Sequence, residues 1–261
     1  MKKTPKLLIL AGTVLAFLFL FGIIFYNNFI KKSIYEENSQ HLLSTYEQVD
    51  KTFTMFVQHN WNALSDWSNN LQYLDDAENM KTLWYDFARR KDAWQYQDFY
   101  MFNENCDFIT AAGRDGNAPN IQGIFLDMYK TGQPVISSYI ASDSNRRIVF
   151  ALPMDVPYTI NGVTYSGLAV SYNNDVVEKL IAGNIYQGQS DCYILTSDGN
   201  VLLSLEPKTE FLQKISNLFD FLNKYTNMTE TEITDLKKNI KNVSTGSLQC
   251  RYNNKNYYLV Y

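Results

Sequence analysis

The chain has 261 residues, of which 46% are hydrophobic and 15% aromatic, with only six prolines. This composition supports one or two packed domains and excludes wholesale disorder. The formal net charge is −4, and without the three lysines that precede the first apolar run the remainder carries 20 basic and 27 acidic residues. Because a nucleic-acid partner requires a basic face, this acidic remainder argues against one.

The first predicted element is a membrane-spanning helix over residues 7–26, preceded by a cytoplasmic tail over residues 1–6. The run contains 20 consecutive residues without a charge. A helix of that length spans about 30 Å, the thickness of a bilayer's hydrocarbon core. Lysines at positions 2, 3 and 6 precede it, so the positive-inside rule places the residues after 27 outside the cell membrane. A cleaved signal peptide is the alternative, but its apolar region would span only about 7–15 residues.

Residues 27–94 predict a long helix that leaves the membrane and a second helix from Ala77 to Trp94. The long helix carries an apolar stripe at steps of three and four, and no proline interrupts it. One helix of about 45 residues fits this pattern, as do two with a break near residues 75–76. Such a stripe packs on a sheet, on a second copy of the chain or on both, so a homodimer through this helix is expected. The stripe comprises Leu42, Tyr46, Val49, Phe53, Phe56 or Val57, Asn60, Leu64, Trp67, Leu71 and Leu74.

From residue 95 the apolar period changes from helical to alternating, which predicts a membrane-distal sheet module over residues 95–172. A hairpin (96–103 and 108–113) leads through the loop "GRDGNAP" and a short helix to three strands. Asn161-Gly162 is a strong turn signal before the last of them. Five antiparallel strands with helices on both faces indicate an α+β fold of the PAS-like type. The last three strands are expected at 134–140, 146–154 and 164–172.

Residues 173–261 repeat this order in a second, membrane-proximal module. An asparagine-capped helix leads to a hairpin whose turn contains Asp198-Gly199, and two helices follow. The first is expected near 208–225, and the second opens with a capping box at Thr229. The closing hairpin ends in "CRYNNKNYYLVY". This module therefore has four predicted strands where the first has five, and we expect its last strand to be absent.

Residue types that carry catalysis are sparse. The two histidines, His41 and His59, lie on the long helix about 27 Å apart, too far to share a metal or a triad. The three cysteines show no metal-ligand spacing, and Cys192 and Cys250 either form a bridge or stay buried as free thiols. The loop at 113–117 lacks the lysine and hydroxyl of a phosphate-binding P-loop. The sequence therefore predicts no enzyme, no metal and no cofactor.

Arginines and aromatic residues of the distal module are the candidate ligand contacts. Side chains alternate along a strand, so Arg147 shares a face with Val149 and Ala151. It either points to solvent or binds an anion at the rim of a pocket, helped by Arg114 in the facing loop. Three aromatic side chains either line that pocket or pack in the core: Tyr100, Phe102 and Tyr172.

Several stretches of the chain resemble the double Cache sensor region of bacterial transmembrane receptors, in particular those of hybrid histidine kinases and diguanylate cyclases. They cover most of residues 95–261: "FYMFNENCDFITAAGRDGN", "RRIVFALPM", "YSGLAVSYNNDVVEKL", "GQSDCYILTSDGNVLLS" and "GSLQCRYNNKNYYLVY". The resemblance implies that a further strand, a second membrane span and a cytoplasmic output domain complete such a receptor. Relatives that bind amino acids hold them with an Arg, Trp, Tyr and Asp set. Arg90, Trp94 and Tyr96 stand in the corresponding region, with a spacing that departs from the family's.

These observations favour the small-molecule-sensing portion of a membrane signal-transduction receptor, in which a ligand shifts the long helix. Two alternatives stay open. One is the N-terminal part of a signalling enzyme, a sensor histidine kinase or a diguanylate cyclase, although the sequence contains no ATP-binding, phosphoacceptor or cyclase motif. The other is a dimerising spacer that binds no ligand.

Overall fold

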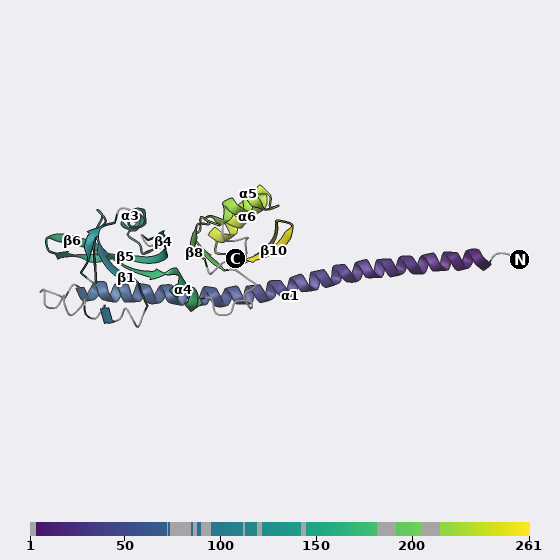
Figure 1. Ribbon diagram of the computed structural model, residues 1–261, viewed down its shortest axis with the longest axis horizontal. Helices are drawn as coiled ribbons and strands as arrows, with labels where there is room; N and C mark the ends of the chain where they lie inside the picture. Colours follow the sequence, from purple (N-terminus) through teal and green to yellow (C-terminus); the bar gives the residue numbers. More distant parts are fainter. Residues whose placement is uncertain are drawn as a thin grey trace.

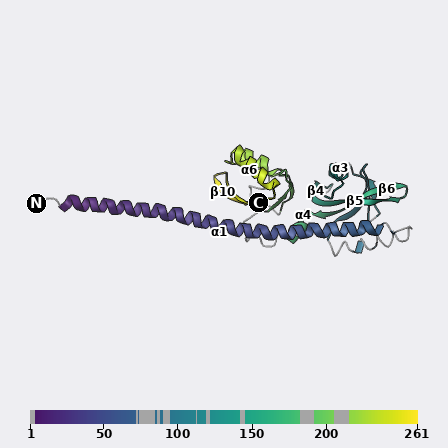
Figure 2. The ribbon, with the colours of Figure 1, turned by 180° about the vertical axis from the view of Figure 1, so that it is seen from behind.

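One helix runs through most of the length of the protein. The computed structural model describes residues 4–71, 73, 85, 88–89, 95–111, 113–118, 122–141, 145–181, 192–204 and 215–261. Helix α1 (Thr4–Leu71) has 68 residues and is therefore about 100 Å long. Both sheet modules lie along its C-terminal half (Figures 1 and 2).

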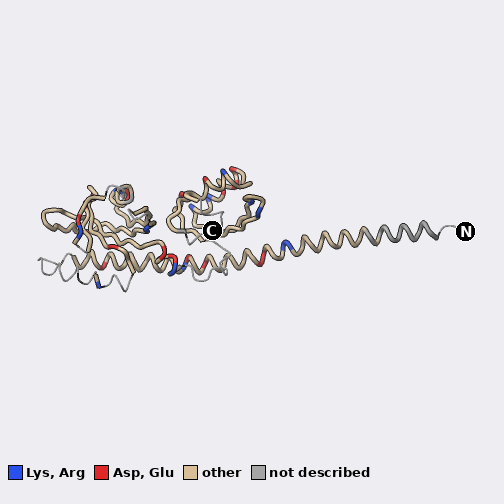
Figure 3. Tube along the Cα trace, viewed as in Figure 1, with Lys and Arg blue, Asp and Glu red and all other residues tan. Residues whose placement is uncertain are grey.

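The N-terminal part of α1 extends away from both modules and is apolar. Among the described residues, α1 is the one helix long and apolar enough to cross a membrane, and no residue of its apolar window is buried. Lys31 is the first charged residue after the apolar run, and Figure 3 shows no charged residue on the described part of the helix that precedes it. The exposed side chains on this part include Phe21 and Phe25, which are 63% and 67% exposed. An apolar surface of this extent requires a cover such as lipid.

The predicted stripe on the long helix packs on the distal sheet. Leu64, Trp67 and Leu71 are buried in one core with that sheet. The Phe56 ring meets the Phe150 ring edge-on, with centroids 5.4 Å apart. α1 is continuous to Leu71, and the predicted second helix over 77–94 lies outside the described residues apart from positions 85, 88 and 89.

The distal module is one antiparallel sheet of six strands in the order β3-β2-β1-β6-β5-β4. Helix α3 (Gln122–Thr131) ends where the sequence predicts and covers one face of the sheet, while α1 covers the other. The strands are β1 (Asp98–Phe102), β2 (Asp107–Thr110), β3 (Asp115–Asn117), β4 (Val135–Ile140), β5 (Arg146–Ile160) and β6 (Val163–Asn173).

Strand β3 corrects the prediction of five strands, because residues expected in a glycine-rich loop pair with β2 instead. The Asn117 side chain donates to an Asp107 carboxylate oxygen at 2.9 Å and to the Asn105 carbonyl at 2.8 Å, which fixes the register. Gly116 lies over the Phe108 ring, where an added Cβ would be 3.3 Å from that ring. The glycine thus permits close approach of a strand to an aromatic side chain.

The hairpin of β5 and β6 extends beyond the rest of the sheet. The sequence placed the end of β5 at Met154, whereas the strand continues to Ile160 through an irregularity between Pro153 and Tyr158. Asn161 and Gly162 both have positive φ, 51° and 80°, as a type I′ turn requires. The predicted turn is therefore confirmed, with longer strands on either side.

In its described residues, the second module contains four strands paired two by two, with two helices between the pairs. Helix α4 (Asn174–Ile181) links the modules, and the turn at Asp198-Gly199 joins β7 to β8 as predicted. The four strands form two separate hairpins, β7–β8 and β9–β10. The elements after α4 are β7 (Tyr193–Leu195), β8 (Val201–Ser204), α5 (Leu218–Tyr225), α6 (Glu230–Lys241), β9 (Ser247–Tyr252) and β10 (Lys255–Val260).

Helix α5 begins later than the sequence suggests. Asn217 caps it by accepting from the backbone N–H groups of Phe219 and Asp220, and its side chain also donates to Asn200 in the β7–β8 hairpin. The helix was expected over residues 208–225, and this prediction is wrong for residues 215–217, where the backbone is not helical. Residues 208–214 lie outside the described residues. The capping box of α6 forms as predicted, since Thr229 and Glu232 bond reciprocally. The three cysteines are free thiols, so the disulfide alternative is wrong.

Candidate ligand-binding site

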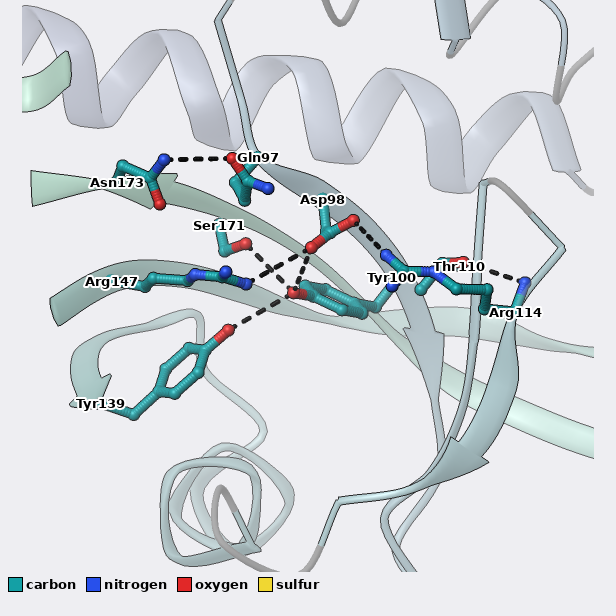
Figure 4. Close-up of polar contacts among 9 residues, drawn as sticks. All are labelled: Gln97, Asp98, Tyr100, Thr110, Arg114, Tyr139, Arg147, Ser171 and Asn173. Atoms are coloured by element: carbon teal, nitrogen blue, oxygen red, sulfur yellow. Dashed lines mark hydrogen bonds and ion pairs between the residues drawn. The ribbon is translucent and has the colours of Figure 1, made fainter. Parts of the chain in front are cut away.

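A charged cluster lies on the face of the distal sheet that α3 covers (Figure 4). Asp98, the first residue of β1, pairs with Arg147 of β5 at 3.5 Å, and the two side chains are only 11% and 15% exposed. Its other carboxylate oxygen accepts from Arg114 at 3.0 Å, and that arginine is 69% exposed. The alternative in which Arg147 points to solvent is therefore wrong. The largely buried Asp98 carboxylate therefore pairs with the largely buried Arg147 and with the exposed Arg114.

Three hydroxyl groups complete the cluster. The Tyr100 hydroxyl lies 3.4 Å from Asp98, 3.3 Å from the Tyr139 hydroxyl and 3.1 Å from the Ser171 hydroxyl. Burial raises the pKa of Tyr100, and the nearby Tyr139 and Asp98 add to the effect. Tyr100 consequently keeps its proton at neutral pH and remains a hydrogen-bond donor.

The sheet topology brings these residues together. β1, β6, β5 and β4 are neighbours, with Asp98 opposite Ser171 and Tyr139 opposite Arg147. Residues directly opposite on antiparallel strands share a face. Four strands therefore each contribute a polar side chain to one face at the same end of the sheet. Small residues, Ala151 of β5 and Ala169 of β6, follow on that face.

The cluster has the chemistry of a reversible binding site. Two guanidinium groups and one carboxylate leave a net charge of +1, and arginine forks hold carboxylates and similar anions by paired hydrogen bonds. Asp98 is the group that a ligand ammonium would engage. The cluster contains neither histidine nor cysteine among the described residues, so it lacks the usual base or thiol nucleophile of acyl transfer.

The residues predicted from the sequence fall into three sets. Tyr100, Arg114 and Arg147 meet in the cluster. Phe102 lies on the same face, but its ring stacks on Phe125 at a centroid distance of 3.7 Å as part of the core. The remaining candidates lie elsewhere: Tyr96 and Tyr172 belong to the core on the α1 face, and Trp94 and Arg90 lie outside the described residues.

Three members of the cluster were not predicted from the sequence: Asp98, Tyr139 and Ser171. The sequence contains a local indication for Asp98, because it is a single acid at the start of an aromatic strand. Asp98 lies two residues before Tyr100 and so shares its face of the strand. The sequence contains no such indication for Tyr139 and Ser171, since their place depends on the register of β4 and β6 against β5.

Comparisons with known proteins identify the fold. No family model and no curated protein matches the chain. The sensory domain of the Campylobacter jejuni chemoreceptor Tlp3 with isoleucine bound matches with a TM-score of 0.53 and 11% identity, over 87% of this chain and 89% of that one. The same domain in complex with 4-methylisoleucine gives a TM-score of 0.54 and 11% identity, over 87% and 86%. The extracellular domain assigned to a histidine kinase, mmHK1S-Z2, gives 0.56 and 12%, over 87% and 91%.

These matches are to sensory and extracellular domains of receptors, not to catalytic domains. The chain has their fold, and the resemblance to double Cache sensor regions is confirmed at that level.

Proposed function

We propose that this chain is the extracytoplasmic, small-molecule-sensing portion of a bacterial membrane receptor. The observation that carries the proposal is the Asp98–Arg147 pair, nearly buried beside the Tyr100 hydroxyl on the distal sheet. Removing two charges from water costs several kcal/mol per ion unless partners compensate, so such pairs are often retained for function rather than stability. Here the pair stands in a fold that other receptors use for sensing.

The ligand that fits this cluster is a small molecule with an acidic group. Arg114 is exposed and holds Asp98 by one contact, so an incoming carboxylate can share its guanidinium without breaking the inner pair. Tyr100 and Tyr139 supply hydroxyl donors beside it. The matched Tlp3 domain binds isoleucine, and an amino acid would use Asp98 for its ammonium.

A route from the cluster to α1 runs through two adjacent residues of β6. Ser171 faces the cluster and bonds to Tyr100, while Tyr172 faces the opposite side and donates to the Asn60 side chain of α1 at 2.9 Å. A ligand that prefers one position of β6 would therefore shift α1, provided that its affinity differs between the two positions. α1 would carry this shift through the membrane, as one of a pair in a homodimer, to a cytoplasmic output domain.

A binding screen on the full chain in detergent or nanodiscs tests the proposal. Carboxylic acids, amino acids and amines are added singly, and the melting temperature of the sheet modules is followed. A compound present at 100 times its Kd should stabilise the protein by about 2.7 kcal/mol. We expect this response from at least one acid-bearing compound and its loss in Arg147→Met.

The matched control is Arg251→Met, because Arg251 is an exposed arginine on the β9–β10 hairpin, outside the cluster. It should keep the full response. A screen without any response, or a response that survives Arg147→Met, would contradict the proposal.

A further inference from the structure

Arg146 and Arg147, the first two residues of β5, serve opposite sides of the distal sheet. Arg147 lies in the charged cluster. Because strand side chains alternate, Arg146 points to the α1 face, together with Ile148 and Ser138. There its Nη1 donates to the Ser138 hydroxyl and to the Val201 carbonyl oxygen, both at 3.1 Å. Val201 belongs to β8 of the second module, so one side chain joins the two modules directly.

The residue whose carbonyl accepts this bond, Val201, lies where the β7–β8 hairpin contacts the start of α5. The Val201 N–H donates to the Ser216 carbonyl at 3.0 Å, directly before Asn217, which caps α5. The β7–β8 hairpin also has two faces. Ile194 and Leu203 pack in the core of α1 and the distal sheet, whereas Leu195 and Val201 pack in the core of the second module. A displacement of β8 at Val201 therefore reaches the second core and the start of α5.

Arg146, the donor of this bond, is adjacent to the charged cluster along β5. Tyr139 pairs with Arg147 across β4 and β5, and the neighbouring residues Ser138 and Arg146 hold the contact to β8. β4 is one of the two edge strands of the sheet, paired with β5 alone among the described strands. An edge strand shifts with fewer broken ladder bonds than a central one, so a rearrangement at Tyr139 would move Ser138 and, through it, the contact of Arg146.

From these contacts we propose that Arg146 couples the charged cluster to the second module. A rearrangement of the cluster would change the hydrogen bond from Arg146 to the backbone carbonyl of Val201. This inference deepens the proposed function, since it assigns the site a second output beside the route through Tyr172 to α1. Arginine suits the role because the two N–H groups of its Nη1 have fixed directions in the guanidinium plane and donate to two acceptors at once, whereas a lysine ammonium rotates freely. Arg146 is a positioning residue and does not itself contact the cluster.

A test without ligand uses Asp98→Asn to disturb the cluster, because this substitution weakens the partner of Arg147. Amide hydrogen exchange of residues 199–204, which include the Val201 N–H, is measured in the full chain. Four proteins are compared: the unsubstituted chain, Asp98→Asn, Arg146→Met and the double variant. Asp98→Asn should change the exchange rate of this segment at least about threefold in the unsubstituted background. The same substitution should have no effect in the Arg146→Met background.

An equal effect of Asp98→Asn in both backgrounds, or no effect in either, overturns the proposal. If Arg146→Met does not fold, Arg146→Lys replaces it; this variant keeps the charge and a donor but not the fork, and should at least halve the response. The result is independent of the ligand screen. Coupling without any ligand response refutes the sensing proposal alone, whereas ligand stabilisation without a change at Val201 refutes the coupling alone.

Discussion

Replacing Tyr172 by phenylalanine should destabilise the protein by about 1–3 kcal/mol, the cost of leaving a buried hydrogen-bonding group without its partner. The Tyr172 hydroxyl donates to Asn60 at 2.9 Å, and both residues are 1% exposed. The substitution removes one oxygen and leaves the ring, which stays in edge contact with Phe56 at 5.1 Å and Phe150 at 6.0 Å. The loss should therefore come from the hydrogen bond rather than from packing.

The assay is thermal unfolding of the full chain in detergent, where about 1 kcal/mol corresponds to a shift of roughly 2–4 °C for a chain of this size. A double-mutant cycle with Asn60→Ala isolates the pair, because Tyr172→Phe should cost less than about 0.5 kcal/mol once the acceptor is gone. Tyr225→Phe, at a 49% exposed tyrosine, is the control and should stay within about 0.5 kcal/mol. Equal losses in both Asn60 backgrounds would refute the reasoning.

Three further substitutions or conditions test the packing, the backbone and the buried thiols. Gly167→Ala places a Cβ 2.5 Å from the buried Phe102 ring and should cost about 1–3 kcal/mol, whereas Gly123→Ala, in open space on α3, should be neutral or stabilising in the same melts. Val243 is 92% exposed at φ 54°, a conformation that costs a β-branched residue about 1–2 kcal/mol, so Val243→Gly should raise the melting temperature; a lower one would count against strain there. Burial raises the pKa of the Cys250 thiol from 9.0 to about 11, so the unfolded thiol ionises first and the free energy of unfolding should fall as pH rises from 9 to 11. Cys250→Ala should make that fall less steep, and an unchanged slope in urea titrations would contradict the assignment.

The sequence was sufficient wherever local chemistry decides the structure. The change from helical to alternating period near residue 95 located the first hairpin, and the Asn161-Gly162 pair located a turn that needs two positive φ angles. Thr229 and Glu232 defined the start of α6 because a capping box is a contact between residues three apart. The stripe on α1 was visible because a helix repeats its buried face at fixed steps.

Contacts between distant segments account for what the sequence did not show. β3 exists because Asn117 reaches back to Asp107, and α5 starts at Leu218 because Asn217 is held by the β7–β8 hairpin. Tyr172 resembled a ligand contact as much as Tyr100 did, since both are tyrosines in aromatic strands. Only the pairing of β6 with β1 and β5 sends one toward α1 and the other toward the charged cluster.

The receptor account requires that the modules and the N-terminus lie on opposite sides of the cell membrane. The most direct measurement is labelling of Asn254→Cys, in the exposed β9–β10 turn, by a membrane-impermeant maleimide in intact spheroplasts. Lys2→Cys serves as the opposite marker, and both variants carry Cys192→Ser, because Cys192 is only partly buried. The two cysteines that remain give a low background, since Cys106 and Cys250 are 1% and 2% exposed. The account predicts that Asn254→Cys reacts in intact spheroplasts and Lys2→Cys only after lysis. Reaction of Asn254→Cys only after lysis would place the modules in the cytoplasm and contradict it.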